Sequence, residues 1–196
     1  MQRIIVIAIA AFAFVAFATI GRVYLVDQHS EDGSVGSVKI GGSFNLVDHT
    51  GKAVSDQDFM GKYMLVYFGY TFCPDVCPTS LSLMAGALDE LTPQQLDNVT
   101  PVFITVDPER DTPENMAAYV EHFHDRLVGL SGTAEQIKDI ARKYKAYYAK
   151  VGTDPDTYTM DHSSITYLIG PNGKYAAHFG HNTPSEQMAK RLADFL

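Results

Sequence analysis

Both cysteines of this 196-residue chain lie in one heptapeptide, residues 72–78, which reads FCPDVCP. The apolar and aromatic run before it, residues 63–70 (YMLVYFGY), has the length and composition of a buried strand. In the stretch after it, residues 78–91, apolar side chains recur at spacings of three and four, as they do along one face of a helix. The heptapeptide therefore marks a junction between a buried strand and a helix, which indicates an α/β fold.

The rest of the chain predicts further strands and helices in alternation. Strands are expected at residues 100–106, 126–130, 165–169 and 174–179. Helices are expected at residues 112–127, 133–148 and 184–196. A short hairpin with a turn at residues 49–51 is expected ahead of the buried strand. This order predicts a thioredoxin-like fold, in which helices flank a central mixed sheet, with an N-terminal hairpin and an extra β-α insertion.

Two of these helices carry sequence signals for their N-termini. Thr112 followed by Pro113 combines a preferred N-cap residue with a proline at the first helical position. Thr133 with Gln136 matches the capping-box pattern. We therefore expect each threonine to cap the helix that follows it.

Residues 4–20 (IIVIAIAAFAFVAFATI) form an apolar stretch without a charged residue. A membrane span needs about 20 residues, and the apolar character continues to Val26, with Arg22 able to reach the headgroups. We therefore predict one transmembrane helix that anchors the protein within residues 1–26. The alternative is a cleaved signal peptide, because residues 16–18 (AFA) resemble an A-x-A cleavage site. Either interpretation predicts export of the domain that follows.

The chain after the apolar stretch divides into a linker and one domain. Residues 27–42 are polar and rich in glycine and serine, which predicts a flexible linker. Residues 43–196 suit a single domain of ordinary size. No transit peptide precedes the apolar stretch, so we expect a bacterial protein. Its predicted location is the cytoplasmic (inner) membrane, as a single-pass protein whose domain faces the periplasm or the cell exterior.

The charge of the chain excludes one class of partner. It contains 15 lysine and arginine residues against 23 aspartate and glutamate residues, a formal net charge of −8. A protein that binds nucleic acid needs a basic surface to neutralise phosphates. We therefore expect no nucleic-acid partner.

The spacing of the two cysteines leaves several kinds of chemistry open. Three residues separate Cys73 from Cys77, whereas a redox C-x-x-C motif has two. The wider loop can close a disulfide, but it can also place both sulfurs around a metal ion. Cys77 is expected at the N-terminal end of a helix, where the dipole and the free amides favour a thiolate. The residues alone therefore allow a disulfide, a redox site or a metal site.

The cysteine heptapeptide and two later motifs resemble those of the Sco/SenC family, the copper chaperones of cytochrome oxidase assembly. The pattern F-x-Y-T-x-C-P-D-x-C-P occurs at residues 68–78, D-P-x-R-D-T at residues 107–112, and D-H-S at residues 161–163. The resemblance implies a thioredoxin-like fold and one copper ion, Cu(I) or Cu(II), per domain. It also implies delivery of that copper to the binuclear copper site of cytochrome c oxidase.

By this resemblance, Cys73, Cys77 and His162 are the copper ligands. The chemistry of these side chains agrees, because soft thiolates select Cu(I) and an imidazole suits both oxidation states. Zinc also accepts two cysteines and one histidine together with a water molecule, so it remains an alternative.

Two acidic residues are expected behind or beside these ligands. Asp107 follows the second predicted strand at the same sheet edge as the cysteines, and we expect it to orient a ligand or a polar loop. Asp75 lies between the cysteines, where it could contact a partner or the amides of the helix start. Arg110 is expected to pair with Asp111 or another local carboxylate.

Other aromatic and histidine residues receive weaker assignments. Tyr70, Phe72 and Tyr167 are expected to form hydrophobic surroundings that limit access of solvent to the metal. His122 and His124 are expected to face solvent.

Two functions follow from these observations. The first is a copper-binding metallochaperone, whose partners would be the copper-site subunit of the oxidase and another periplasmic copper chaperone or a thioredoxin-like reductant. The second is a thiol-disulfide reductase that keeps the cysteines of the oxidase reduced, with Cys73 as the attacking thiolate and Cys77 as the resolving one. Delivery requires His162, whereas simple thiol exchange does not.

Overall fold

The structure, a computed structural model, describes residues 39–155 and 157–196. The predicted membrane anchor and most of the predicted linker lie outside these residues. Within the described part of the chain, no helix combines the length and the apolar composition that crossing a membrane requires.

The described residues contain strands and helices in an order close to the predicted one. The strands are β1 (Asn45–Asp48), β2 (Ala53–Ser55), β3 (Tyr63–Gly69), β4 (Val99–Thr105), β5 (Val128–Ser131), β6 (Tyr148–Val151), β7 (Thr159–His162), β8 (Ile165–Ile169) and β9 (Tyr175–Gly180). The helices are η1 (Asp56–Phe59), α2 (Val76–Asp89), α3 (Pro93–Leu96), α4 (Pro113–Val120), α5 (Ala134–Tyr144) and α6 (Ser185–Ala193).

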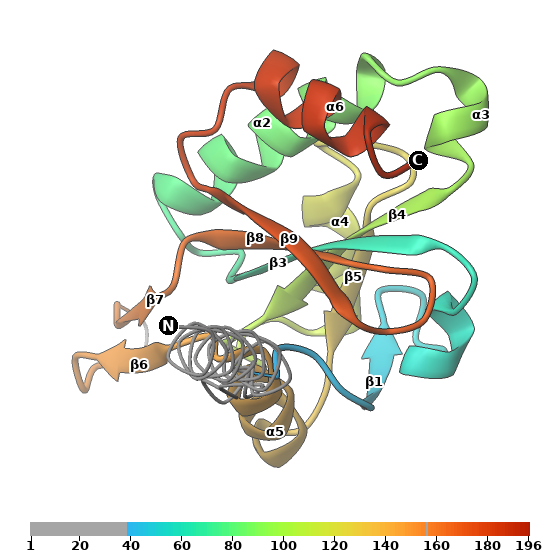
Figure 1. The fold of residues 1–196 in the computed structure, drawn as a ribbon. Helices are drawn as coiled ribbons and strands as arrows, with labels where there is room; N and C mark the ends of the chain where they lie inside the picture. The colour runs from blue at the N-terminus through green and yellow to red at the C-terminus, as the bar shows by residue number, and fades with distance from the viewer. Residues whose placement is uncertain (1–38, 156) are drawn as a thin grey trace, which may run out of the picture. The chain divides into compact units, whose positions relative to one another are not determined.

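Seven of the strands form one mixed sheet in the order β2-β1-β5-β4-β3-β8-β9. The central strands β3, β4 and β5 run parallel, while β8 joins β3 and β1 joins β5 antiparallel. Helices α2 and α6 lie together over one face of the sheet, and α5 covers the opposite face (Figure 1). The predicted mixed sheet with helices on both faces is therefore confirmed.

Strand β3 carries the centre of the hydrophobic core. All its residues after Tyr63 are buried, as expected for a strand that is covered on both faces. Because side chains alternate along a strand, Tyr67 stacks with Phe103 on one face, while Phe68 meets Tyr144 of α5 on the other. Burial of each such large apolar side chain stabilises the fold by roughly 1.5–3 kcal/mol relative to exposure. The cysteine heptapeptide thus follows a strand that is buried on both faces of the sheet.

Both predicted helix caps are confirmed. The hydroxyl of Thr112 accepts a hydrogen bond from the backbone amide of Asn115 at the start of α4. Thr133 and Gln136 form the reciprocal capping box at the start of α5.

The predicted ends of α4 and α5 were wrong. Helix α4 stops at Val120, so Leu127 packs from the following loop rather than from the helix. Helix α5 stops at Tyr144 because Lys145 adopts a left-handed conformation, with φ of 58°. Tyr148, assigned to this helix from its spacing, lies instead in strand β6.

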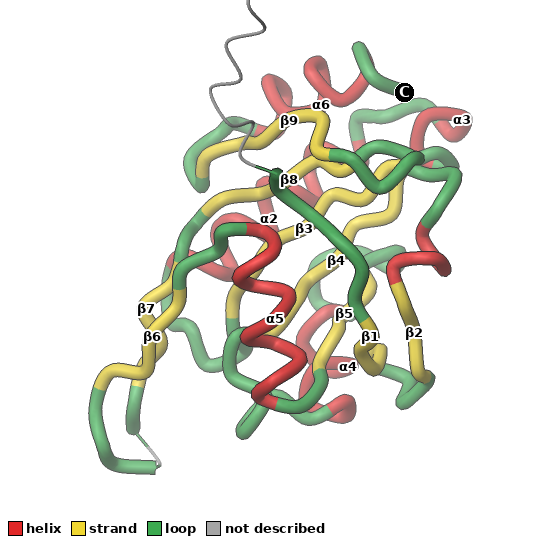
Figure 2. Tube along the Cα trace, turned by 60° about the horizontal axis from the view of Figure 1, so that its bottom comes forward, coloured by secondary structure: helices red, strands yellow, loops and turns green. Residues whose placement is uncertain are grey.

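Strands β6 and β7 form a feature that the sequence did not predict. They pair antiparallel as a separate two-stranded sheet, in which Tyr148 lies opposite His162. Figure 2 shows this hairpin extending from one end of the domain, beside α5. The predicted histidine ligand, His162, is therefore the last residue of β7.

Candidate metal centre

The two cysteines are placed by the turn that leads from β3 into α2. The backbone amide of Cys73 donates a hydrogen bond to the carbonyl of Tyr70, which closes the turn at 3.3 Å. Cys77 is the second residue of α2, and its backbone amide points at Cys73 Sγ at a distance of 3.4 Å. The first turn of the helix thus directs an otherwise unpaired amide toward the first sulfur.

His162 approaches these sulfurs from the end of β7. Its Nδ1 lies 3.2 Å from the backbone carbonyl of Ser163, and because a carbonyl only accepts, Nδ1 carries the proton there. Its Nε2 then presents a lone pair and lies 3.2 Å from Cys77 Sγ. The two sulfurs and this nitrogen all lie within 4.8 Å of one another.

Two tyrosine rings contact the imidazole. The rings of Tyr67 and Tyr70 meet the ring of His162 edge to face, with centroids 6.1 Å and 5.9 Å away. Sequence reasoning named Tyr70 but missed Tyr67, although the alternation along the strand before the cysteines places Tyr67 on the same face as Gly69, which contacts Cys77.

The other aromatic residues assigned to the site lie differently. Phe72 is 55% exposed, so it does not shield the sulfurs from solvent. Tyr167 packs against Phe68 and Tyr144, which fixes its ring on the α5 face of the sheet.

The pKa values of the two cysteines are shifted in opposite directions. The side-chain hydrogen bond with Cys77, together with the amides of Asp75 and Cys77, outweighs burial and lowers the pKa of Cys73 far below its usual value. Burial, followed by the neighbouring Cys73 sulfur, raises the pKa of the fully buried Cys77 thiol. The metal-free site therefore holds a thiolate at Cys73 and a thiol at Cys77. The helix start was expected to favour a thiolate at Cys77, but its amide acts on Cys73 instead.

Asp107 is buried and supports the segment that leads into β7. It accepts a hydrogen bond of 2.6 Å from the hydroxyl of Tyr158 and pairs with Arg110. Tyr158 immediately precedes β7, the strand that ends at His162.

Asp75 occupies the N-cap position of α2, and its side chain is exposed. That side chain makes no capping hydrogen bond to the helix.

Asp111 is a fully buried carboxylate that fixes the loop ahead of the cysteines. It accepts hydrogen bonds from the amide and hydroxyl of Thr71 and from the hydroxyl of Thr105. Burial raises the pKa of this carboxyl, although the three donors oppose the shift. Arg110 was expected to pair with Asp111 or another local carboxylate. It pairs with Asp107, and Asp111 is bound by the threonines instead.

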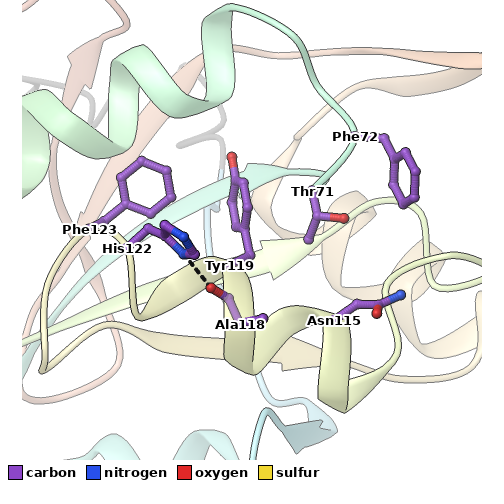
Figure 3. Close-up of a pocket in the computed structure, with 7 residues that line it drawn as sticks. All are labelled: Thr71, Phe72, Asn115, Ala118, Tyr119, His122 and Phe123. Carbon is purple, nitrogen blue, oxygen red and sulfur yellow. Dashed lines mark hydrogen bonds between the residues drawn. The ribbon is translucent and has the colours of Figure 1, made fainter.

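A surface hollow of about 480 Å³ lies beside the site but contains none of its three donor atoms. Figure 3 shows Thr71 and Phe72 from the cysteine loop on one side and residues of α4 and the turn after it on the other. His122 is exposed at its rim, as predicted, and from the turn after α4 its Nδ1 contacts the carbonyl of Ala118 in that helix. This hollow is therefore separate from the ligating side chains.

The arrangement can hold one metal ion or form one disulfide. Among the residues that the structure describes, Cys73, Cys77 and His162 are the group of three ligating side chains that lies within reach of one ion. Two sulfurs and one imidazole nitrogen fit soft and borderline ions such as Cu(I) and Zn²⁺. The two cysteines are not joined by a disulfide in this structure.

Comparison with known proteins places the chain in a family. A sequence profile described as SCO1/SenC matches residues 33–196. The chain belongs to the SCO1/SenC family. Among its relatives, the SCO2-like protein RC0895 of Rickettsia conorii is 47% identical over 158 residues, which cover 80% of this chain and 77% of that protein. Protein sco1 of Schizosaccharomyces pombe is 43% identical over 165 residues, 83% of this chain but only 63% of the fission-yeast protein, less than two thirds of its length.

Solved structures of the family share this fold. The structure of Bradyrhizobium japonicum ScoI with copper bound has a TM-score of 0.74 and 43% identity, covering 80% of this chain and 99% of that chain. BsSco, described as a member of the Sco family of cytochrome c oxidase assembly proteins, has a TM-score of 0.64 and 25% identity, covering 79% of this chain and 92% of that chain. The predicted thioredoxin-like domain thus corresponds to the fold of the Sco proteins.

Proposed function

We propose that this protein binds one copper ion through Cys73, Cys77 and His162 and delivers it to the binuclear copper site of cytochrome c oxidase during assembly. The observation that carries the proposal is the convergence of two sulfurs and the free Nε2 within 4.8 Å. The three donors come from the β3–α2 turn and from β7, segments that only the folded domain brings together.

The donor set favours copper as the cargo. Thiolates are soft ligands that select Cu(I), and the imidazole suits either oxidation state. A relative with 43% identity has been solved with copper bound. Three donors leave a coordination position for a ligand from the receiving protein, so the ion can pass by ligand exchange without a turnover reaction.

Membership of the family indicates which protein would receive the copper. BsSco is described as belonging to the cytochrome c oxidase assembly proteins, and this chain shares its fold and family. We infer that the receiving partner is the copper-site subunit of the oxidase, and that another periplasmic copper chaperone or a thioredoxin-like reductant acts upstream. The apolar stretch of residues 4–20 would anchor the domain at the outer side of a bacterial inner membrane.

The two acidic residues support the site in different ways. Asp107 would maintain the position of the histidine-bearing strand through Tyr158. Asp75 is exposed between the two cysteines, where it could meet a receiving protein.

Copper binding to residues 39–196, with the thiols reduced beforehand, tests the proposal. We expect one equivalent of Cu(II) to produce an intense thiolate-to-copper charge-transfer band. The band should be lost in Cys73→Ser and Cys77→Ser and altered in His162→Ala. His181→Ala is the matched control, because His181 is exposed and lies outside the group of three ligands. Binding of Zn²⁺ with no tight copper binding would refute the proposal.

The unequal state of the two sulfurs favours a second candidate function, a thiol-disulfide reductase. The Cys73 thiolate would attack a disulfide of the oxidase subunit, form a mixed disulfide and release one partner thiolate. Cys77, after losing its proton, would then attack Cys73 Sγ, form the Cys73–Cys77 disulfide and release the second partner thiolate. The partner gains two electrons and this protein loses them. This function survives His162→Ala, whereas copper delivery does not, so restoration of oxidase activity by that variant separates the two.

A further inference from the structure

The histidine and the cysteines of the site are carried by two different β-sheets of the domain. The cysteines follow β3 of the seven-stranded sheet, whereas His162 ends β7 of the two-stranded sheet. No strand pairing joins the two sheets within the described residues. In Figure 1 the β6–β7 hairpin lies beyond the end of the main sheet, near the start of α2. The pairing of β8 with β3 brings the two parts to one edge of the main sheet, because β8 begins three residues after His162. We ask which side-chain contacts then fix the orientation of the imidazole toward the sulfurs.

Arg110 makes the contacts that connect these parts. Its guanidinium carbon lies 3.6 Å from the ring centroid of Tyr158 and 4.6 Å from that of Phe72, so the cation contacts both rings. Its Nη1 donates a hydrogen bond of 3.0 Å to the backbone carbonyl of Tyr158, and its Nε pairs with Asp107. Tyr158 immediately precedes β7, and Phe72 immediately precedes Cys73. One side chain thus contacts the neighbours of both halves of the site.

A second line of contact leads from Arg110 to the imidazole itself. The guanidinium lies 5.9 Å from the ring of Tyr70, and that ring meets the ring of His162 edge to face. The Tyr158 ring is also covered by Lys150, whose ammonium lies 3.8 Å from its centroid and pairs with Glu109. Tyr158 is therefore held by two cations and by Asp107, and only 5% of it is exposed.

The shape of the guanidinium matters more than its charge here. A planar group can donate along two edges while its faces contact aromatic rings, which an ammonium cannot do. Lysine would retain a positive charge beside Asp107 but lose the bond to the Tyr158 carbonyl and the contact with both rings. The site therefore offers a conservative substitution that separates positioning from charge balance.

We infer that Arg110 is a positioning residue for His162. Through Tyr158 and Tyr70, it holds the β6–β7 hairpin where His162 Nε2 faces the sulfurs. The inference rests on the proposed copper site, and it assigns to the middle of the D-P-x-R-D-T motif a role in metal affinity without contact with the metal.

A double-mutant cycle on the purified full-length chain tests this role. We expect Arg110→Lys to weaken copper affinity about tenfold or more, as substitutions behind metal ligands commonly do, and to shift the charge-transfer band as His162→Ala does. If Arg110 acts through His162, adding Arg110→Lys to His162→Ala should change affinity by less than about twofold. A general loss of stability would instead weaken the double variant by the product of the two single effects.

The metal-free protein provides a second readout. In its NMR spectrum, the His162 ring nitrogens of the wild type should show one fixed tautomer, while those of Arg110→Lys should show the averaged signals of a free imidazole. Arg142→Lys is the matched control, because Arg142 also pairs with an aspartate three residues earlier, Asp139, but on the exposed surface of α5. It should leave affinity, band and ring signals unchanged.

Each outcome decides a different question. If the wild type does not bind copper tightly, the proposed function fails. If the wild type binds and Arg110→Lys keeps its affinity, band and ring signals, the positioning role fails while the function stands. Should Arg110→Lys fail to fold, Tyr158→Leu replaces it in the cycle, since this variant removes the ring that the guanidinium contacts and keeps the backbone carbonyl. Wild-type affinity and ring signals in that variant would also overturn the inference.

Discussion

Cys77 Sγ lies 3.2 Å from His162 Nε2, although 85 positions separate the two residues in the chain. The sheet explains how they meet. Strand β3 ends just before the cysteine turn, and its antiparallel neighbour β8 begins just after His162, so the end of one strand and the start of the other share a sheet edge. The metal-binding geometry therefore depends on the packing around the end of β3.

Gly69 leaves the space that Cys77 Sγ occupies. A Cβ added at Gly69 would lie 2.7 Å from Cys77 Sγ and 2.9 Å from the ring of Phe103, closer than either can approach without moving. We expect Gly69→Ala to destabilise the domain by about 1–3 kcal/mol, as overpacking of a core does. Displacement of the sulfur should also weaken copper binding. Urea unfolding and copper titration measure the two effects.

Gly180→Ala is the control for this substitution. Gly180 also ends a strand of the sheet, but a Cβ added there meets no atom within 4 Å. We expect a change in the free energy of unfolding of less than about 0.5 kcal/mol. Equal effects of the two substitutions would show that the space beside Cys77 is not tightly filled.

The low pKa of Cys73 predicts an unusual pH dependence of its reactivity. Only the thiolate reacts with iodoacetamide. Below its pKa of about 8.5, an ordinary thiol therefore reacts about tenfold faster for each unit by which the pH rises. Hydrogen bonding by Cys77 and two backbone amides keeps the pKa of Cys73 well below that range. In the reduced, metal-free protein we therefore expect one residue, Cys73, to be alkylated at nearly the same rate at pH 6 and pH 7.

Mass spectrometry of the alkylated protein locates the label. The same protein unfolded in urea is the control, and there both cysteines should show the tenfold dependence. A tenfold rise between pH 6 and pH 7 in the folded protein would contradict a stabilised thiolate, and labelling of Cys77 first would reverse the assignment.

The parts of the fold that local signals determine could be predicted from the sequence. Strand β3 was evident because a strand buried on both faces is apolar throughout, and the caps of α4 and α5 were evident because threonine bonds amides close in the chain. The ligand set came from motifs that resemble a family. Its two cysteines are close in sequence, and His162 was assigned through the D-H-S motif of the same resemblance.

The parts that depend on contacts distant in the chain could not be predicted. The spacing of Ile137, Ile140, Tyr144 and Tyr148 suggested one continuous helix, but the left-handed turn at Lys145 ends it, and lysine gives no signal of such a turn. Strand β6 is therefore absent from the prediction, and with it the hairpin that carries His162. The contact of Arg110 with Tyr158 spans 48 positions and could be recognised only in the folded structure.

Thr112 provides a test of the α4 cap, which begins directly after the segment containing Asp107 and Asp111. Its hydroxyl accepts a hydrogen bond of 3.3 Å from the backbone amide of Asn115. We expect Thr112→Ala to lower the free energy of unfolding by about 1 kcal/mol. Thr112→Ser keeps the oxygen and should recover most of the loss. If serine and alanine destabilise equally, the methyl group rather than the hydroxyl is responsible.

Asp111 should make part of the stability of the domain dependent on pH. Burial raises the pKa of its carboxyl in the folded state above the usual 3.8, so as pH rises the unfolded chain ionises first. The contribution of Asp111 is therefore fully present below pH 3.8 and is lost as pH rises through the folded pKa. Asparagine keeps the shape of the side chain without its charge. The free energy of unfolding of the wild type minus that of Asp111→Asn should thus be larger at pH 4 than at pH 7, as measured by urea unfolding.

Asp111→Ala provides the comparison at neutral pH. It removes every acceptor that Thr71 and Thr105 use, so we expect it to cost about 1–3 kcal/mol more than the asparagine variant, the usual penalty for buried donors left unpaired. A difference between wild type and asparagine that grows from pH 4 to pH 7 would mean that the threonines stabilise the carboxylate more than burial destabilises it. Asp111 would then be a permanently charged anchor of the cysteine loop, and acid rather than alkali would loosen the site.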